Sequence, residues 1–123
     1  LAESFTRCAL RDVVVAGVSA GACAAAPFTL GWDDAERPFF APCFAMGVEA
    51  PLDVHSEDDD WAEMRVLLEL VRGRPELPQV GIVIPTGSGL EIDAKGGMRS
   101  FGKRACERRS LAFDGSWRIE AIS

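Results

Sequence analysis

Residues 13–27 read VVVAGVSAGACAAAP, and this stretch decides the fold that the sequence predicts. The four apolar residues 13–16 predict a buried strand, because strands of a parallel sheet covered on both faces carry continuous apolar runs. Residues 17–21 predict a tight turn, and the alanine-rich residues 20–26 predict a helix that ends at Pro27. The order of strand, turn and helix indicates an α/β protein.

Other segments extend this pattern. Periodicity predicts a helix over residues 2–11, a short strand over 51–55, an amphipathic helix over 58–72 and a second buried strand over 80–84. Residues 90–93, 111–113 and 117–122 predict short strands, and Asp114-Gly115 between the last two is a hairpin signal. No linker or repeat divides the chain, so we expect one α/β domain over residues 1–123 that ends in an antiparallel β-ribbon.

Composition limits the classes of function. The 123 residues are 48% hydrophobic and 26% charged, which is typical of one soluble globular domain, and we expect a cytoplasmic location and no membrane partner. The net charge of -6 argues against a nucleic-acid partner. Cys8, Cys23, Cys43 and Cys106 form no C-x-x-C pair, so we expect buried free thiols and, with a single histidine, no metal site.

Ser19 lies between Gly17 and Gly21 in a G-x-S-x-G pattern. After a strand and before a helix, this pattern predicts a nucleophile elbow, a sharp turn that exposes the serine hydroxyl. The backbone N–H of Ala20 at the helix start could then stabilise an oxyanion. The alternative is a glycine-rich turn in which the Ser19 hydroxyl only caps the helix.

A nucleophilic serine needs a base and usually an acid. His55, the only histidine, follows the strand predicted over residues 51–55, although a lone histidine is often a surface or core residue. Asp33 and Asp34 are candidate acids, with a turn or cap role as the alternative. The acidic residues 57–60 are better explained as a helix cap than as a metal site.

Together, VVVAGVSAGACAAAP, the acidic turn after it, His55 and the later segment GIVIPTGSGLEID resemble the serine peptidases of the aspartyl dipeptidase (peptidase E) and cyanophycinase family. The resemblance implies a parallel-sheet three-layer sandwich of the class I glutamine amidotransferase-like type, of which this chain would hold the C-terminal half. It implies Ser19 as nucleophile, His55 as general base, Ala20 as one oxyanion donor and Asp34 as an acidic residue near the site. It also implies dipeptidase or exopeptidase activity without cofactor or metal.

The sequence departs from this family in three places. Thr86 stands where members carry a glutamate, which leaves Asp34 as the candidate acid by elimination. Residues 56–62 are acidic and contain no arginine, so we expect no preference for aspartyl substrates. Members have further strands before the elbow, so we expect a partner chain or a homo-oligomer to cover the apolar edge near Val14.

Two classes of function follow from these observations. The first is a serine peptidase-like hydrolase that acts on short peptides. The second is a catalytically incomplete interaction module that retains the elbow as a structural turn. Within the hydrolases, an esterase is the alternative to the peptidase.

Overall fold

The computed structural model of the chain describes Glu3 and residues 14–123. The helices within residues 14–123 are α2 (Ala20–Cys23), the short 3-10 helix η1 (Glu57–Asp59) and α3 (Ala62–Val71). The strands are β1 (Phe28–Trp32), β2 (Pro38–Pro42), β3 (Leu52–Val54), β4 (Gly81–Ile84), β5 (Ser88–Ile92), β6 (Met98–Gly102), β7 (Glu107–Leu111) and β8 (Trp117–Ala121). The helix predicted over residues 2–11, with Cys8, falls outside the described residues except for Glu3.

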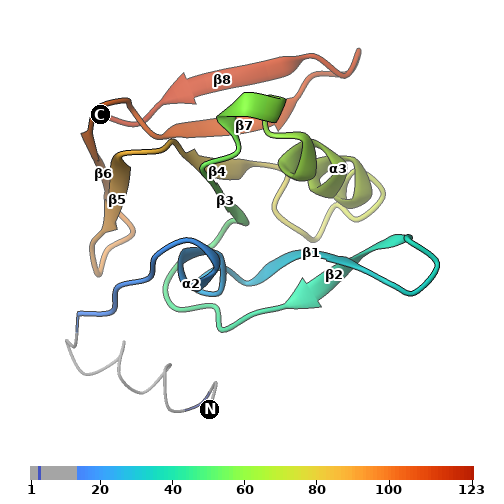
Figure 1. Cartoon of the computed structure of the whole chain (residues 1–123), viewed down its shortest axis with the longest axis horizontal. Helices are drawn as coiled ribbons and strands as arrows, with labels where there is room; N and C mark the ends of the chain where they lie inside the picture. The colour runs from blue at the N-terminus through green and yellow to red at the C-terminus, as the bar shows by residue number, and fades with distance from the viewer. Residues whose placement is uncertain (1–2, 4–13) are drawn as a thin grey trace.

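A four-stranded mixed sheet forms the centre of the molecule, in the order β3-β4-β7-β8. β3 and β4 are parallel, whereas β4 with β7 and β7 with β8 are antiparallel. Two antiparallel hairpins, β1-β2 and β5-β6, form separate two-stranded sheets beside it (Figure 1). No helix of the described residues has the length and apolar character needed to cross a membrane.

The predicted fold class is therefore wrong. The described residues are 33% strand and 16% helix, in small mixed and antiparallel sheets, and they do not form a helix-flanked parallel three-layer sandwich of the class I glutamine amidotransferase-like type. One cause lies before the elbow: residues 14–16 form no strand, and the side chain of Val14 is 92% exposed. The other cause is β4. Its continuous apolar run reflects burial on both faces, but β4 is parallel only to β3 and is antiparallel to β7.

The two faces of β4 are covered by different elements. Val83 packs against α3 in a cluster with Phe28, Trp61, Met64, Leu67, Leu68 and Val71. Ile82 belongs to a second cluster with Ala26, Val48, Leu52, Cys106 and Ile122, and Leu90, Ile92 and Met98 of the β5-β6 hairpin pack against it. The β5-β6 hairpin therefore covers the face of β4 on which a three-layer sandwich would have a helix.

Gly81 of β4 lies against Met64 of α3. A Cβ on Gly81 would lie 2.2 Å from the sulfur of Met64, so any other residue at this position would require the buried Met64 side chain to move. The helix predicted over residues 58–72 begins later than expected, because Asp60 and Trp61 adopt positive φ angles of 54° and 60° and interrupt it after η1.

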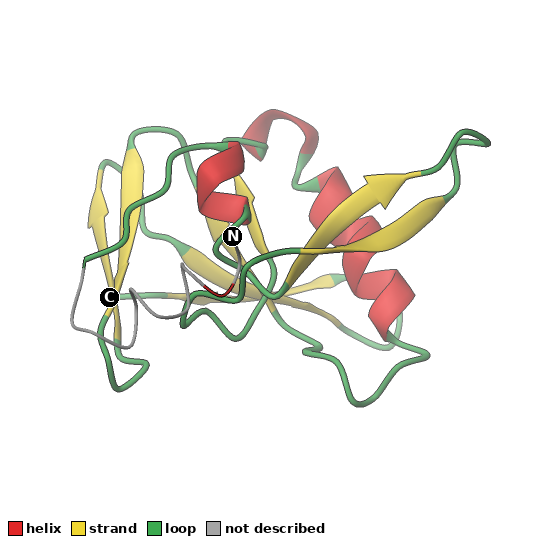
Figure 2. Ribbon diagram, turned by 90° about the horizontal axis from the view of Figure 1, so that it is seen from below, coloured by secondary structure: helices red, strands yellow, loops and turns green. Residues whose placement is uncertain are grey.

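The β1-β2 hairpin was missed from the sequence because prolines occupy both ends of β2. A two-stranded sheet leaves each strand with a free side, where Pro38 and Pro42 remove no essential hydrogen bond. The hairpin starts beside α2 and extends away from it, as both views show (Figures 1 and 2). Its turn, which contains Asp33 and Asp34, therefore lies at the far end from α2.

Candidate active site

Ser19 and His55 are brought together by the fold. Oγ of Ser19 lies 2.8 Å from Nε2 of His55, and the hydrogen bond is exposed to solvent. Ser19 immediately precedes α2, and His55 immediately follows β3, the edge strand of the central sheet. The two residues proposed from the sequence as nucleophile and base thus have the contact that such a pair requires.

The backbone of Ser19 is strained. Its φ of 54° and ψ of -123° fall in a region that residues other than glycine rarely adopt, at a cost of about 1–3 kcal/mol. The Ser19 side chain makes no capping hydrogen bond to α2, so the alternative role of Ser19 as a helix cap is not what the structure shows. The hydroxyl is directed to His55 instead.

The two glycines of the pattern differ in how much space surrounds them. A Cβ on Gly17 would lie 2.4 Å from the carbonyl oxygen of Gly21, so the turn needs glycine at position 17. A Cβ on Gly21 would meet nothing within 4 Å. The turn therefore requires glycine at position 17 but not at position 21.

The backbone around Ala20 leaves one amide available. The N–H of Gly21 donates to the carbonyl of Val18, and that of Ala22 donates to the carbonyl of Ser19, at 2.9 Å each. The N–H of Ala20 donates to no group in the part of the chain that the structure describes. Because α2 has only four residues, its dipole contributes little here, and the single amide is the main donor.

β4 holds the backbone of His55 in place. The N–H of His55 donates to the carbonyl of Ile84 at 3.0 Å, which continues the parallel pairing of β3 with β4 by one residue. The φ of His55 is 46°, which is a left-handed backbone conformation that residues other than glycine rarely adopt. Strained residues on both sides of one hydrogen bond are a pattern that clusters at functional sites.

The predicted acids are not brought to this pair. Asp33 binds its own turn, where it accepts hydrogen bonds from the N–H groups of Ala35 and Arg37 and pairs with the Arg37 guanidinium at 2.8 Å. These bonds lower the pKa of Asp33, and the bond from the backbone N–H of Arg37 has the largest effect. Asp34 is in the same turn, and no described contact links it to Ser19 or His55.

Two further carboxylates lie two residues before and two residues after His55 in the sequence. Asp53 is 9% exposed and accepts a hydrogen bond from the Ser56 hydroxyl at 3.0 Å, and its burial raises its pKa. Glu57 accepts a hydrogen bond from the N–H of Thr86 at 3.0 Å. The available signal was the spacing D-x-H-x-E around the only histidine, which the sequence analysis read as a strand end and a helix cap.

Cys23, Cys43 and Cys106 are free cysteines in the described part of the chain. Burial, followed by the nearby charge of Asp53, raises the pKa of Cys23 to about 11, and burial also raises the pKa of Cys43. Cys106 is fully buried, whereas Cys23 and Cys43 are partly exposed. Within residue 3 and residues 14–123, no group of three or more His, Cys, Asp or Glu residues is arranged to hold a metal ion.

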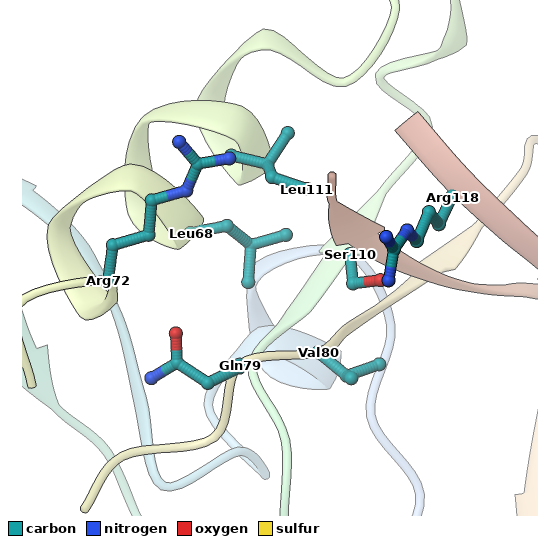
Figure 3. Close-up of a pocket in the computed structure, with 7 residues that line it drawn as sticks. All are labelled: Leu68, Arg72, Gln79, Val80, Ser110, Leu111 and Arg118. Carbon is teal, nitrogen blue, oxygen red and sulfur yellow. The ribbon is translucent and has the colours of Figure 1, made fainter. Parts of the chain in front are cut away.

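A small cavity of about 260 Å³ lies elsewhere, between the end of α3 and the β7-β8 hairpin (Figure 3). Its lining is Leu68, Arg72, Gln79, Val80, Ser110, Leu111 and Arg118. It contains none of the site residues predicted from the sequence, and the guanidinium of Arg72 is already bound to the carbonyl of Ala112. The serine site is therefore an exposed surface site and not part of this cavity.

Comparison with known proteins assigns no family to the chain: no family model matches it, and no curated protein gives a significant match.

Proposed function

We propose that the chain is a serine hydrolase of peptidase type, with Ser19 as nucleophile and His55 as general base. The observation that carries the proposal is the 2.8 Å hydrogen bond between Oγ of Ser19 and Nε2 of His55. The strained φ of Ser19 supports it, since strain that serves no capping role is expected where a hydroxyl must be held for reaction.

The residues can perform acyl transfer in two steps. Oγ of Ser19 attacks the carbonyl carbon, its proton passes to Nε2 of His55, and the N–H of Ala20 donates to the oxyanion. The C–N bond breaks as His55 returns the proton to the leaving amine. Water then attacks the acyl-serine ester, gives its proton to His55, and releases the acid with Ser19 reprotonated.

The exposed site is accessible to short peptides as substrates, because the hydrogen bond between Ser19 and His55 lies at the surface. The acidic residues Glu57, Asp58 and Asp59 follow His55 closely and would repel an acidic side chain. We therefore expect neutral or basic dipeptides to be cleaved in preference to aspartyl ones.

A second candidate function is an interaction module of incomplete catalytic ability. Val14 and Val18, on the approach to Ser19, are 92% and 87% exposed. The pair of Ser19 and His55 would react best when shielded from water. The exposed valines next to it therefore suggest a site that a second chain completes. A homo-oligomer or a partner chain would then supply the cover and a second oxyanion donor.

Hydrolysis assays test the proposal directly. A panel of neutral, basic and aspartyl dipeptides, together with p-nitrophenyl acetate for the esterase alternative, is incubated with wild type and Ser19→Ala. Turnover of neutral dipeptides that Ser19→Ala abolishes supports the peptidase. Equal rates in both proteins would contradict it, and turnover of the ester alone would favour the esterase.

A further inference from the structure

We propose that Glu57, and not Asp34, is the carboxylate that positions His55. This inference rests on the proposed function, because a positioning acid matters only where His55 acts as a base. It is carried by the placement of Glu57 two residues after His55 and by the unequal use of its two carboxylate oxygens.

The hydrogen bond of His55 to Ser19 creates a requirement at the other ring nitrogen. For Nε2 to accept the proton of the Ser19 hydroxyl, the neutral ring must carry its own proton on Nδ1. An Nδ1–H group keeps this tautomer and orientation when it donates to a carboxylate. Asp34, at the distal turn of the β1-β2 hairpin, is not placed to accept it (Figure 1).

Glu57 is anchored at the sheet edge that also holds His55. The N–H of His55 donates to the carbonyl of Ile84, and two residues further along the same strand end the N–H of Thr86 donates to Oε1 of Glu57 at 3.0 Å. The backbone N–H of His55 and the side chain of Glu57 therefore both link the segment that follows β3 to the end of β4 and the residues after it. The carboxylate of Glu57 is fixed by Thr86, the residue at which the sequence lacks an acid.

The second oxygen of Glu57 is unused. Oε2 is buried and has no hydrogen-bond partner in the described part of the chain. A buried carboxylate oxygen without a donor is costly, which points to a donor that it meets in another state of the site. In the proposed arrangement, this donor is the Nδ1–H group of His55.

Asp53 is the competing carboxylate on the other side of His55. Its Oδ2 is also buried without a partner among the described groups, and its Oδ1 is bound by Ser56. Burial raises the pKa of Asp53, whereas the hydrogen bonds from its own backbone and from Thr86, with a smaller effect of Arg104, lower the pKa of Glu57. A carboxylate whose pKa is lowered is the better partner for a ring that becomes charged, and together with the hydrogen bond to Thr86 this favours Glu57.

The test measures the state of the His55 ring and the reactivity of Ser19 separately. His55 is the only histidine, so its ring nitrogens give isolated NMR signals in the intact chain. The variants are Glu57→Gln, which retains an acceptor for Thr86, Asp53→Asn, Asp34→Asn, and Asp58→Asn as a control with the same charge loss in the same helix. Thermal unfolding of each variant shows whether it is folded.

We expect Glu57→Gln to reduce the Nδ1–H tautomer of His55, because the carboxylate of Glu57 accepts this hydrogen bond in the proposed arrangement. Labelling of Ser19 by a fluorophosphonate should slow by at least about tenfold, with a shifted pH profile. Asp58→Asn should leave both measurements unchanged.

An unchanged tautomer of His55 in folded Glu57→Gln would overturn the inference, as would an effect confined to Asp53→Asn or Asp34→Asn. If wild type is not labelled at all but Glu57→Gln changes the tautomer of His55, the proposed function fails while the pairing of Glu57 with His55 stands. If wild type is labelled and Glu57→Gln is labelled equally fast, the proposed function stands while the positioning role of Glu57 fails.

Discussion

Oγ of Ser19 and Nε2 of His55 lie 2.8 Å apart, although 36 residues separate them in the chain. The contact joins the residue before α2 to the residue after β3. Each has a positive φ, 54° for Ser19 and 46° for His55, so the hydrogen bond connects two strained backbone positions. The predictions below follow from this strained pair and its surroundings.

The strain at Ser19 predicts a difference between two variants that both remove the hydroxyl. Ser19→Gly should be more stable than Ser19→Ala by roughly 1 kcal/mol, because glycine adopts a positive φ without the cost that alanine retains. Urea denaturation measures the free energy of unfolding of both. An alanine variant as stable as the glycine variant would show that Ser19 is not strained in solution.

The two glycines beside Ser19 predict opposite outcomes for the same substitution. Gly17→Ala should destabilise the fold by about 1–3 kcal/mol and abolish labelling of Ser19, because its Cβ would collide with the carbonyl of Gly21. Gly21→Ala has open space within α2 and should be neutral or more stable by up to about 1 kcal/mol. Urea denaturation and probe labelling check both variants, and equal damage from the two would contradict this description of the elbow.

Asp53 predicts a pH dependence of stability. Burial raises its pKa in the folded protein above the unfolded value of about 3.9, so the folded state holds the extra proton between these two values. The stability that Asp53 contributes is therefore complete below about pH 4 and is lost as the pH rises through the folded pKa.

Comparison with Asp53→Asn isolates this contribution. The free energy of unfolding of wild type should fall relative to that of Asp53→Asn as the pH is raised from about 4 to 7. Other carboxylates, such as Asp33 and Asp114, have lowered pKa values and give the opposite trend at lower pH in both proteins. A difference between the two proteins that is constant with pH would contradict the prediction.

The exposed valines before the elbow predict self-association or binding of a partner chain. Wild type should scatter light as a dimer or larger species, and Val14→Ser/Val18→Ser should be monomeric, because it removes two apolar side chains that are 92% and 87% exposed. Phe113→Ser is a matched control, since Phe113 is fully exposed but lies in the distant β7-β8 turn. A monomeric wild type would count against a homo-oligomer.

The sequence predicted local elements better than their assembly. The strands around residues 51–55 and 80–84 are confirmed as β3 and β4, the amphipathic helix is confirmed as α3 with a later start, and the turn at Asp114-Gly115 joins β7 to β8. Apolar period and turn residues act over a few positions, so they can be recognised without knowledge of the partner strand. Strand direction depends on distant partners, and the continuous run of β4 was equally compatible with antiparallel pairing to β7.

The candidate site was predictable to a similar extent. Ser19 and His55 carry rare patterns, a serine between glycines and a single histidine, and the structure places them in contact. The acid was not predictable by the same means, because acidic residues are common: Asp34 was chosen by elimination, whereas Glu57 was explained by its place in the acidic residues before α3. The unpaired oxygen distinguishes Glu57 from Asp58, Asp59 and Asp60, and the hydrogen bond from Thr86 distinguishes it from Asp53, which also has an unpaired oxygen.

Site-mapped labelling with a fluorophosphonate probe tests the central claim most directly. Wild type, Ser19→Ala and His55→Ala are treated at neutral pH, and the modified peptide is identified by mass spectrometry. The account predicts labelling at Ser19 in wild type, none at this position in Ser19→Ala, and a loss of at least about a hundredfold in rate in His55→Ala. A folded wild type that is not labelled at Ser19, or that is labelled equally fast without His55, would contradict the claim that these two residues form an activated nucleophile.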